Sequence, residues 1–204
     1  AAGAHSITVH LRADRRHIQE ADVRLLRRKI GTKLNLEMGN TPEILAIALE
    51  VRPDFVCMVP ENRQEVTTEG GLDVAGQKAR LKECCAALRE CGIRVSMFID
   101  PDPQQIEASR EIGAPVVELH TGAYAEATGE HQAKELMRLV QASRQGAQRS
   151  LGLGAVQAFC TFGVGQLGDH LGGVERGVVA AVRLRPVERT VGEAVQRFTV
   201  TGMG

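Results

Sequence analysis

The stretch at residues 33–38, Lys-Leu-Asn-Leu-Glu-Met, alternates polar and apolar side chains. A period of two residues predicts a β-strand whose two faces differ in character. One face is wholly apolar, and the other carries Asn35 and Glu37. A parallel strand covered by helices buries its apolar face against them. The pattern therefore predicts a covered strand with a carboxylate on its opposite face.

Similar segments recur along the chain and are separated by helical patterns. Strands are predicted at residues 6–11, 33–38, 55–60, 94–99 and 116–121. Helices are predicted at about residues 19–30, 42–51, 76–91, 102–112 and 130–150. Thr41 before Pro42 is typical of a helix start, and Gly92 and Gly113 are typical of helix ends. Strands alternating with helices of this length indicate βαβ units and an α/β fold with a parallel sheet.

Two architectures fit this order of elements, a doubly wound open sheet and a closed barrel. Polar side chains share one face in the first strand, Thr8 and His10, and in the last, Glu118 and His120. Together with Glu37, they are expected to converge on one interior near the carboxyl ends of the strands. Barrel enzymes keep their chemistry there, so the pattern favours a TIM (β/α)₈ barrel.

Five strand–helix units are visible, whereas a complete barrel has eight. We therefore expect residues 1–204 to form a single, incomplete (β/α) barrel domain. Its first strand is absent, and its last two units are unrecognisable.

The composition changes abruptly at about residue 152. Residues 152–204 contain no Ile, Lys, Asn, Ser or Tyr, and glycines interrupt any helical period. Gly163, Gly165 and Gly168 have the spacing of a dinucleotide-binding loop but lack the flanking strand and helix that such a loop needs. This segment is left unassigned.

Charge and cysteine content limit the classes of partner. Lys and Arg number 25 and Asp and Glu also 25, so no net charge favours nucleic acid or membrane as a partner. The five cysteines lack metal-ligand spacing, which predicts reduced thiols in a cytoplasmic protein without a metal site. Cys84 and Cys85 are adjacent in a helical pattern, so one is expected in the core and the other at its flank.

The densest polar cluster, His-Leu-Arg-Ala-Asp-Arg-Arg-His at residues 10–17, follows the first strand. Arg binds phosphate through several donors, and His exchanges protons near neutral pH. The cluster, with two His and three Arg in eight residues, therefore predicts a site for an anionic ligand. The alternative is a solvated loop that caps the next helix.

Interior carboxylates are the second candidate feature. Glu37 on an interior strand face is costly unless it is paired or functional, and it has the chemistry of a general base. The alternative is a structural ion pair. Glu118 and His120 allow the same two interpretations.

A third candidate is the loop at residues 65–73, which contains Thr67, Gly70 and Gly71. Adjacent glycines let backbone amides approach a ligand, and Thr hydroxyls bind phosphate. The alternative is a surface loop without function.

Five segments resemble the pyridoxine 5′-phosphate synthase family over residues 1–151: ITVHLRADRRHI, LNLEM, VPENRQEVTTEGGLDVAGQ, FIDPDPQQIEAS and GAPVVELHTGAYA. The resemblance implies a cytoplasmic, homo-oligomeric (β/α)₈ barrel. It implies condensation of 1-deoxy-D-xylulose 5-phosphate with 3-amino-2-oxopropyl phosphate, releasing phosphate and water, in vitamin B6 biosynthesis. It implies small phosphorylated substrates, no metal and no organic cofactor.

The resemblance also implies roles for individual residues. His10 and Glu37 match catalytic positions, and Glu118 matches a position that stabilises the transition state. Arg12, His17 and Thr67 match positions that hold the deoxyxylulose phosphate.

The chain departs from the family pattern in two places. The family's first-strand Asn-x-Asp-His motif is absent, and Ala158 stands where Asn-Ala-Gly-His-Gly supplies a proton-donating His. We expect a slipped reading frame or foreign sequence near residue 152, and little turnover by this exact chain. The alternatives are an inactive barrel remnant that binds a phosphorylated ligand or an intact subunit, and an unrelated sugar-phosphate aldolase or epimerase.

Overall fold

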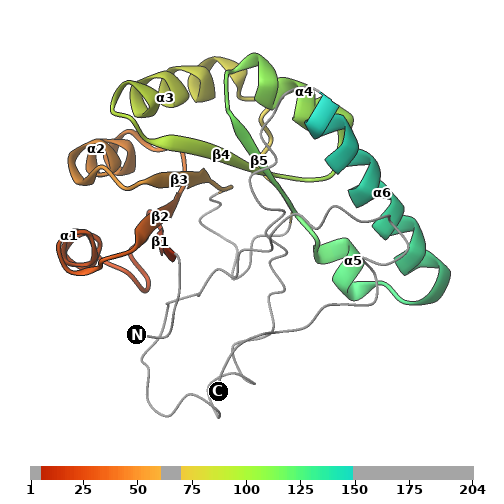
Figure 1. Ribbon diagram of the computed structural model, residues 1–204, viewed down its shortest axis with the longest axis horizontal. Helices are drawn as coiled ribbons and strands as arrows, with labels where there is room; N and C mark the ends of the chain where they lie inside the picture. The colour runs from red at the N-terminus through yellow and green to blue at the C-terminus, as the bar shows by residue number, and fades with distance from the viewer. Residues whose placement is uncertain (1–5, 61–69, 149–204) are drawn as a thin grey trace, which may run out of the picture.

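The computed structural model describes residues 6–60 and 70–148 of the chain. Five parallel strands form one sheet in the order of the sequence: β1 (Ser6–Leu11), β2 (Lys33–Met38), β3 (Phe55–Met58), β4 (Arg94–Ile99) and β5 (Val116–Leu119). Figure 1 shows these strands as a curved sheet with the helices along its outer side. The sheet therefore has an outer face under the helices and an opposite face, which we call the interior face.

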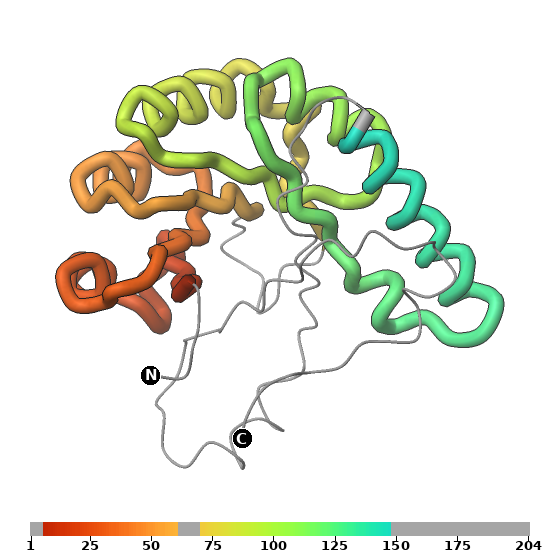
Figure 2. The backbone as a smooth tube through the Cα atoms, in the orientation of Figure 1, coloured from red at the N-terminus to blue at the C-terminus, as the bar shows by residue number. Residues whose placement is uncertain are grey.

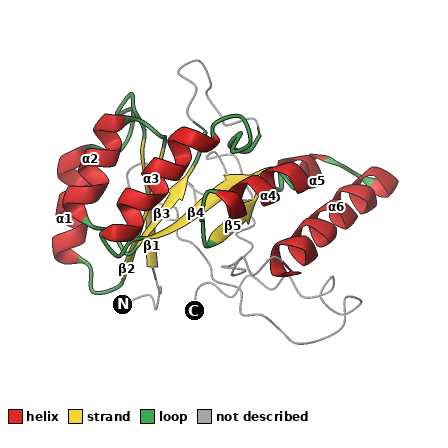
Figure 3. Cartoon of the chain, turned by 90° about the horizontal axis from the view of Figure 1, so that it is seen from above, coloured by secondary structure: helices red, strands yellow, loops and turns green. Residues whose placement is uncertain are grey.

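The helices connect successive strands and then extend past the last one. They are α1 (Glu20–Lys29), α2 (Pro42–Val51), α3 (Lys78–Glu90), α4 (Pro103–Glu111), α5 (Gly122–Glu126) and α6 (Gly129–Gln148). α6 packs beside both α4 and α5 (Figure 3). Within the described ranges, none of these helices is both long and apolar enough to cross a membrane.

The main hydrophobic core lies between the sheet and the helices. Alternate strand residues such as Leu36, Met58 and Met97 are fully buried there and pack in one cluster with helix residues such as Ile44 and Leu81. Burial of these apolar faces is the main favourable term that holds each helix on the sheet. The polar members of each strand consequently lie on the interior face, as the alternation predicted.

The order of the strands distinguishes the two architectures that the sequence left open. A doubly wound sheet reverses its strand order at a switch point and carries helices on both faces. Here, the chain passes round the arc from β1 to β5 without reversal, as the colour sequence in Figure 2 shows. The prediction of an α/β fold built as part of a TIM barrel is therefore confirmed.

Local signals place the ends of the helices. The Thr41 side chain accepts a hydrogen bond from the Ile44 amide, and Pro42 occupies the first helical position. Gly92 and Gly113 follow α3 and α4 with φ angles of 75° and 79°, a left-handed conformation that costs glycine little. These starts and stops agree with the sequence predictions.

Three details differ from expectation. β3 ends at Met58 and β5 at Leu119, two residues earlier than predicted, although the His120 amide still donates to the Ile99 carbonyl. The short helix α5 was not predicted, because five residues are too few to show a helical period. Cys84 and Cys85 are both buried, whereas adjacency suggested that one would lie at the flank of the core.

Candidate active site

Four side chains form a row across the interior face. His10 of β1 is in register with Glu37 of β2, which is in register with Cys57 of β3, and Cys57 is in register with Ser96 of β4. Strands in a parallel sheet lie about 5 Å apart, so neighbouring members of this row are within reach of one another. The row lies towards the carboxyl ends of the strands, where barrel enzymes bind their substrates.

Glu118 of β5 joins this row from the next level. It is buried, and its Oε1 accepts a hydrogen bond of 2.6 Å from the Ser96 hydroxyl. The Cys57 thiol donates a second hydrogen bond to the same carboxyl group. The Glu118 carboxylate thus accepts hydrogen bonds from side chains of β3 and β4.

The two interior carboxyl groups have unlike environments. Burial and then the negative charge of Glu118 raise the pKa of Glu37 to about 7. Burial also raises the pKa of Glu118, but the hydrogen bonds from Ser96 and Cys57 oppose that effect. Within residues 6–60 and 70–148, Glu37 Oε1 and Glu118 Oε2 have no hydrogen-bond partner. At neutral pH, Glu37 therefore exists in both protonation states.

The imidazole of His10 is neutral at the same pH. Burial and then the positive charge of Arg12 lower its pKa from 6.5 to about 4, while Asp14 acts in the opposite sense. A neutral imidazole beside a half-protonated carboxyl group can accept or pass on protons. His10 and Glu37 together form a candidate acid–base pair.

Arg12, in the loop after β1, lies beside His10. Arg12 makes two hydrogen bonds of 3.1 Å to the Asp14 carboxylate, and its side chain is 16% exposed. Arg15 donates to Glu20 and Glu43 and holds the loop against α1 and α2. His17 is exposed. Arg12 and His17 thus lie on the same loop, Arg12 partly buried and His17 open to solvent.

A second polar pair ties the loops after β4 and β5 together. His120 Nδ1 lies 3.2 Å from Asp100 Oδ1, and the His120 ring packs edge-on against Phe98. The Gly71 amide donates to the Asp100 carboxylate, so this pair also fixes the return of the chain towards α3. Thr67, the remaining predicted site residue, lies outside the described residues.

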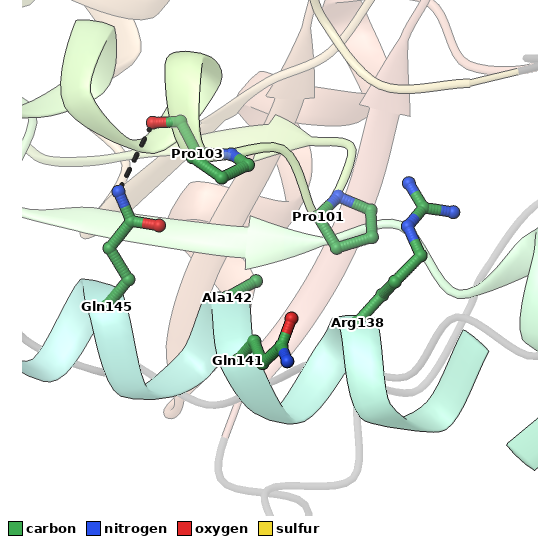
Figure 4. Close-up of a pocket in the computed structure, with 6 residues that line it drawn as sticks. All are labelled: Pro101, Pro103, Arg138, Gln141, Ala142 and Gln145. Carbon is green, nitrogen blue, oxygen red and sulfur yellow. Dashed lines mark hydrogen bonds between the residues drawn. The ribbon is translucent and has the colours of Figure 1, made fainter. Parts of the chain in front are cut away.

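A cavity of about 250 Å³ lies away from this site, between α6 and the turn before α4 (Figure 4). Pro101, Pro103, Arg138, Gln141, Ala142 and Gln145 line it. Its volume is below the usual range for small-molecule sites, about 300–1,000 Å³, and none of the predicted site residues contributes to it. The described residues also include no group of three or more His, Cys, Asp or Glu side chains placed to hold a metal ion.

Comparison with known proteins identifies the family of this chain. The family described as pyridoxal phosphate biosynthesis protein PdxJ matches residues 1–165. The chain belongs to this family. A relative named pyridoxine 5′-phosphate synthase, from Synechococcus sp. (strain JA-2-3B'a(2-13)), is 57% identical over 165 residues, which are 80% of this chain and 69% of the relative.

Membership of the PdxJ family confirms the resemblance seen in the sequence and extends it. The family match continues to residue 165, beyond the limit of 151 that the quoted segments suggested. The structure brings Glu118 into one interior cluster with the row of His10 and Glu37 and places Arg12 beside His10.

Sequence reasoning missed two members of this cluster, Cys57 and Ser96. Both occupy the polar parity of their strands, because their neighbours Val56, Met58, Val95 and Met97 belong to the main core. A lone small polar residue in an apolar strand was the available signal. Its significance depends on a partner from another strand, which one strand cannot reveal.

Proposed function

We propose that this chain is a pyridoxine 5′-phosphate synthase that condenses 1-deoxy-D-xylulose 5-phosphate with 3-amino-2-oxopropyl phosphate and releases phosphate and water. Membership of the PdxJ family and the 57% identical relative support the proposal. The observation that carries it is the interior cluster at the ends of parallel strands, which combines a neutral imidazole with the half-buried carboxyl group of Glu37 and the buried one of Glu118.

The reaction needs such groups because each of its steps moves protons. An amine must condense with a ketone, a phosphate must leave, and a carbon–carbon bond must close the pyridine ring. General acid–base catalysis is most effective when the pKa of the catalytic group lies near the working pH. Glu37, with a pKa of about 7, meets that condition, and we assign it the role of catalytic base.

His10 is assigned the second proton-transfer role, and substrate binding prepares it. The positive charge of Arg12 helps to keep the pKa of His10 low. A substrate phosphate bound to Arg12 would offset that charge and raise the basicity of the imidazole. Glu118, already held by Ser96, is suited to stabilise positive charge that develops on the condensing nitrogen.

We assign the binding of the deoxyxylulose phosphate to Arg12, His17 and Thr67. Arg offers forked donors that match a phosphate, and a His and a Thr hydroxyl add further hydrogen bonds. This assignment includes no metal or organic cofactor.

A cytoplasmic homo-oligomer completes the proposal. Cys57, Cys84, Cys85 and Cys91 are free thiols in the described part of the chain, as reduced cytoplasmic proteins usually show. Light scattering of the purified product of the native gene tests the oligomer. A monomeric mass at micromolar concentration would contradict it.

Turnover by the product of the native gene tests the activity. With both substrates, we expect formation of pyridoxine 5′-phosphate and of inorganic phosphate. Glu37→Gln keeps the size of the side chain but removes the base, so kcat should fall by about 10²–10⁴-fold. Glu50→Gln is the matched control, because Glu50 is exposed on α2 and pairs only with Arg24 among the described residues.

Two results would reject the proposal in favour of an alternative. Consumption of the sugar phosphate without the aminoketone would indicate an aldolase or epimerase. Binding of either phosphate ester without any turnover would indicate an inactive barrel remnant.

A further inference from the structure

Ser96 lies at the centre of the interior cluster, although no catalytic role is assigned to it above. Its neighbours Val95 and Met97 pack into the main core, while Ser96 itself faces the interior and is 7% exposed. Its hydroxyl lies 2.6 Å from Glu118 Oε1 and 3.4 Å from the Val56 carbonyl oxygen. A hydroxyl at 2.6 Å from a buried carboxylate makes a short, charge-assisted hydrogen bond.

The two contacts of Ser96 allow it to serve both protonation states of Glu118. A hydroxyl has one hydrogen, so it donates to one oxygen at a time. When Glu118 is ionised, Ser96 donates to Oε1. When Glu118 is protonated, the carboxyl O–H can donate to Ser96, which then donates to the Val56 carbonyl. Glu118 can therefore lose and regain its proton while the Ser96 hydroxyl keeps a hydrogen bond in both states.

The neighbouring carboxyl group receives no comparable support. Burial and the charge of Glu118 govern the pKa of Glu37, and no hydrogen bond from the described residues contributes to it. Glu118, in contrast, accepts from Ser96 and from Cys57. Two carboxyl groups that share a low-dielectric space ionise one after the other, and the one with donors ionises first.

We propose that Ser96 is a positioning residue that holds Glu118 as the anionic member of the carboxyl pair and so leaves the exchangeable proton on Glu37. Cys57 supports the same carboxylate from β3. His10, Glu37 and Cys57 are the titratable groups that face Glu118 from the other described strands of the interior. This inference rests on the proposed function, in which Glu118 stabilises the transition state and Glu37 moves the proton.

Replacement of Ser96 in the product of the native gene tests the inference with two readouts. Ser96→Ala removes the donor, so the acidic limb of the kcat profile should move to higher pH. At neutral pH, kcat should fall about 10- to 100-fold, the usual effect of one hydrogen bond to a charged group, with a smaller change in KM. Ser96→Thr keeps the hydroxyl and should restore both the limb and the rate.

The second readout is the titration of the Glu118 carboxyl band by infrared difference spectroscopy, assigned with Glu118→Gln. In Ser96→Ala, the band should titrate at higher pH than in the wild type. The matched control is Ser109→Ala on α4, which removes a buried hydroxyl bonded only to the Gln105 carbonyl among the described residues. If Ser96→Ala does not fold, Ser96→Cys retains the volume with a weaker donor and should give a smaller shift of the same sign.

The two readouts separate this inference from the proposed function. A shifted band without synthase turnover in the wild type would reject the proposed function but support the hydrogen-bonding role of Ser96. An active wild type whose Ser96→Ala variant keeps the same band titration and the same pH profile would overturn the inference.

Discussion

Glu37 makes the stability of the folded chain depend on pH in a way that can be isolated. Its pKa is raised from 4.5 to about 7, so the folded state holds this proton more tightly than the unfolded chain does. Between these two values the folded state binds more protons, and its free energy of unfolding must fall as the pH rises. Glu37→Gln removes this effect. The unfolding free energy of the variant minus that of the wild type should therefore increase from about pH 4.5 to about pH 7.

The total increase should be roughly 3 kcal/mol, because one pKa unit corresponds to about 1.4 kcal/mol. Urea unfolding at a series of pH values measures it. Glu50→Gln, at an exposed position on α2, should give a flat difference over the same range. A flat or falling difference for Glu37→Gln would show that the interior does not disfavour this carboxylate.

The lowered pKa of His10 predicts that stability changes with pH in the opposite direction over nearly the same pH range. Its pKa is lowered from 6.5 to about 4, so the unfolded chain binds more protons between these values and stability rises with pH. For His10→Gln, the difference from the wild type should accordingly fall as the pH rises from about 4 to 6.5. Thermal or urea unfolding at a series of pH values measures this difference. A difference that rises with pH, as for Glu37→Gln, would contradict a neutral His10 imidazole.

Period-two alternation was enough to place His10, Glu37 and Glu118 on one face, because parity within a strand is a local property. It could not show that Glu118 has donors while Glu37 has none among the described residues, because the donors to Glu118 come from β3 and β4. Protonation states in this site are set by neighbours that are distant in sequence.

At the scale of elements, the return of the chain before α3 is fitted closely to β4. A Cβ on Gly71 would lie 2.2 Å from the Asp100 amide nitrogen, and the Leu72 amide donates to the Phe98 carbonyl at 2.7 Å. The obstacle is backbone, which cannot move aside as a flexible side chain can. Gly71→Ala should therefore destabilise the fold by about 1–3 kcal/mol, the usual cost of overpacking.

Gly31→Ala is the matched control, since a Cβ there meets nothing within 4 Å. It should leave the midpoint of thermal unfolding unchanged or slightly raised, because alanine restricts the unfolded chain more than glycine does. Equal midpoints for the two variants would show that the chain at Gly71 can move away from β4.

The range over which each signal acts explains which elements could be predicted from the sequence. Helices α2 and α4 begin at Thr41-Pro42 and Asp102-Pro103, signals that act within one turn. The ends of β3 and β5 were placed two residues too late. After β3 the apolar residues Val59 and Pro60 follow, and after β5 His120 continues the alternation begun by Glu118. Where pairing stops depends on the adjacent strand, as with the His120 amide and the Ile99 carbonyl.

In the whole molecule, the two faces of the sheet have different roles. Apolar side chains on the outer face form the main core, whereas the interior face carries buried polar groups such as Asn35, Ser96 and Glu118. Buried polar groups without partners cost free energy, so a ligand that supplies partners should stabilise the fold. The order of the five strand–helix units was predictable from periodicity. The free-energy cost of the polar groups on the interior face depends on contacts between strands, so only the structure shows it.

Ligand binding at the interior should therefore raise the unfolding temperature. Pyridoxine 5′-phosphate at one hundred times its dissociation constant should add about 2.7 kcal/mol to the free energy of unfolding. Arg12→Gln should lose most of this gain, because Arg12 is the described guanidinium beside His10 that we assign to the phosphate. Calorimetry with and without the ligand measures the gain in each variant.

Arg24 offers a closely matched control for Arg12. Each arginine makes two hydrogen bonds to one carboxylate, Arg12 to Asp14 and Arg24 to Glu50. Arg24 belongs to α1, on the outer side of the sheet, so Arg24→Gln should retain the full gain from the ligand (Figure 1). An equal loss of the gain in both variants would mean that the product binds through general charge. A full gain in Arg12→Gln would exclude this arginine as the phosphate ligand. Only a loss of the ligand-induced stabilisation confined to Arg12→Gln agrees with a binding site at the carboxyl end of β1.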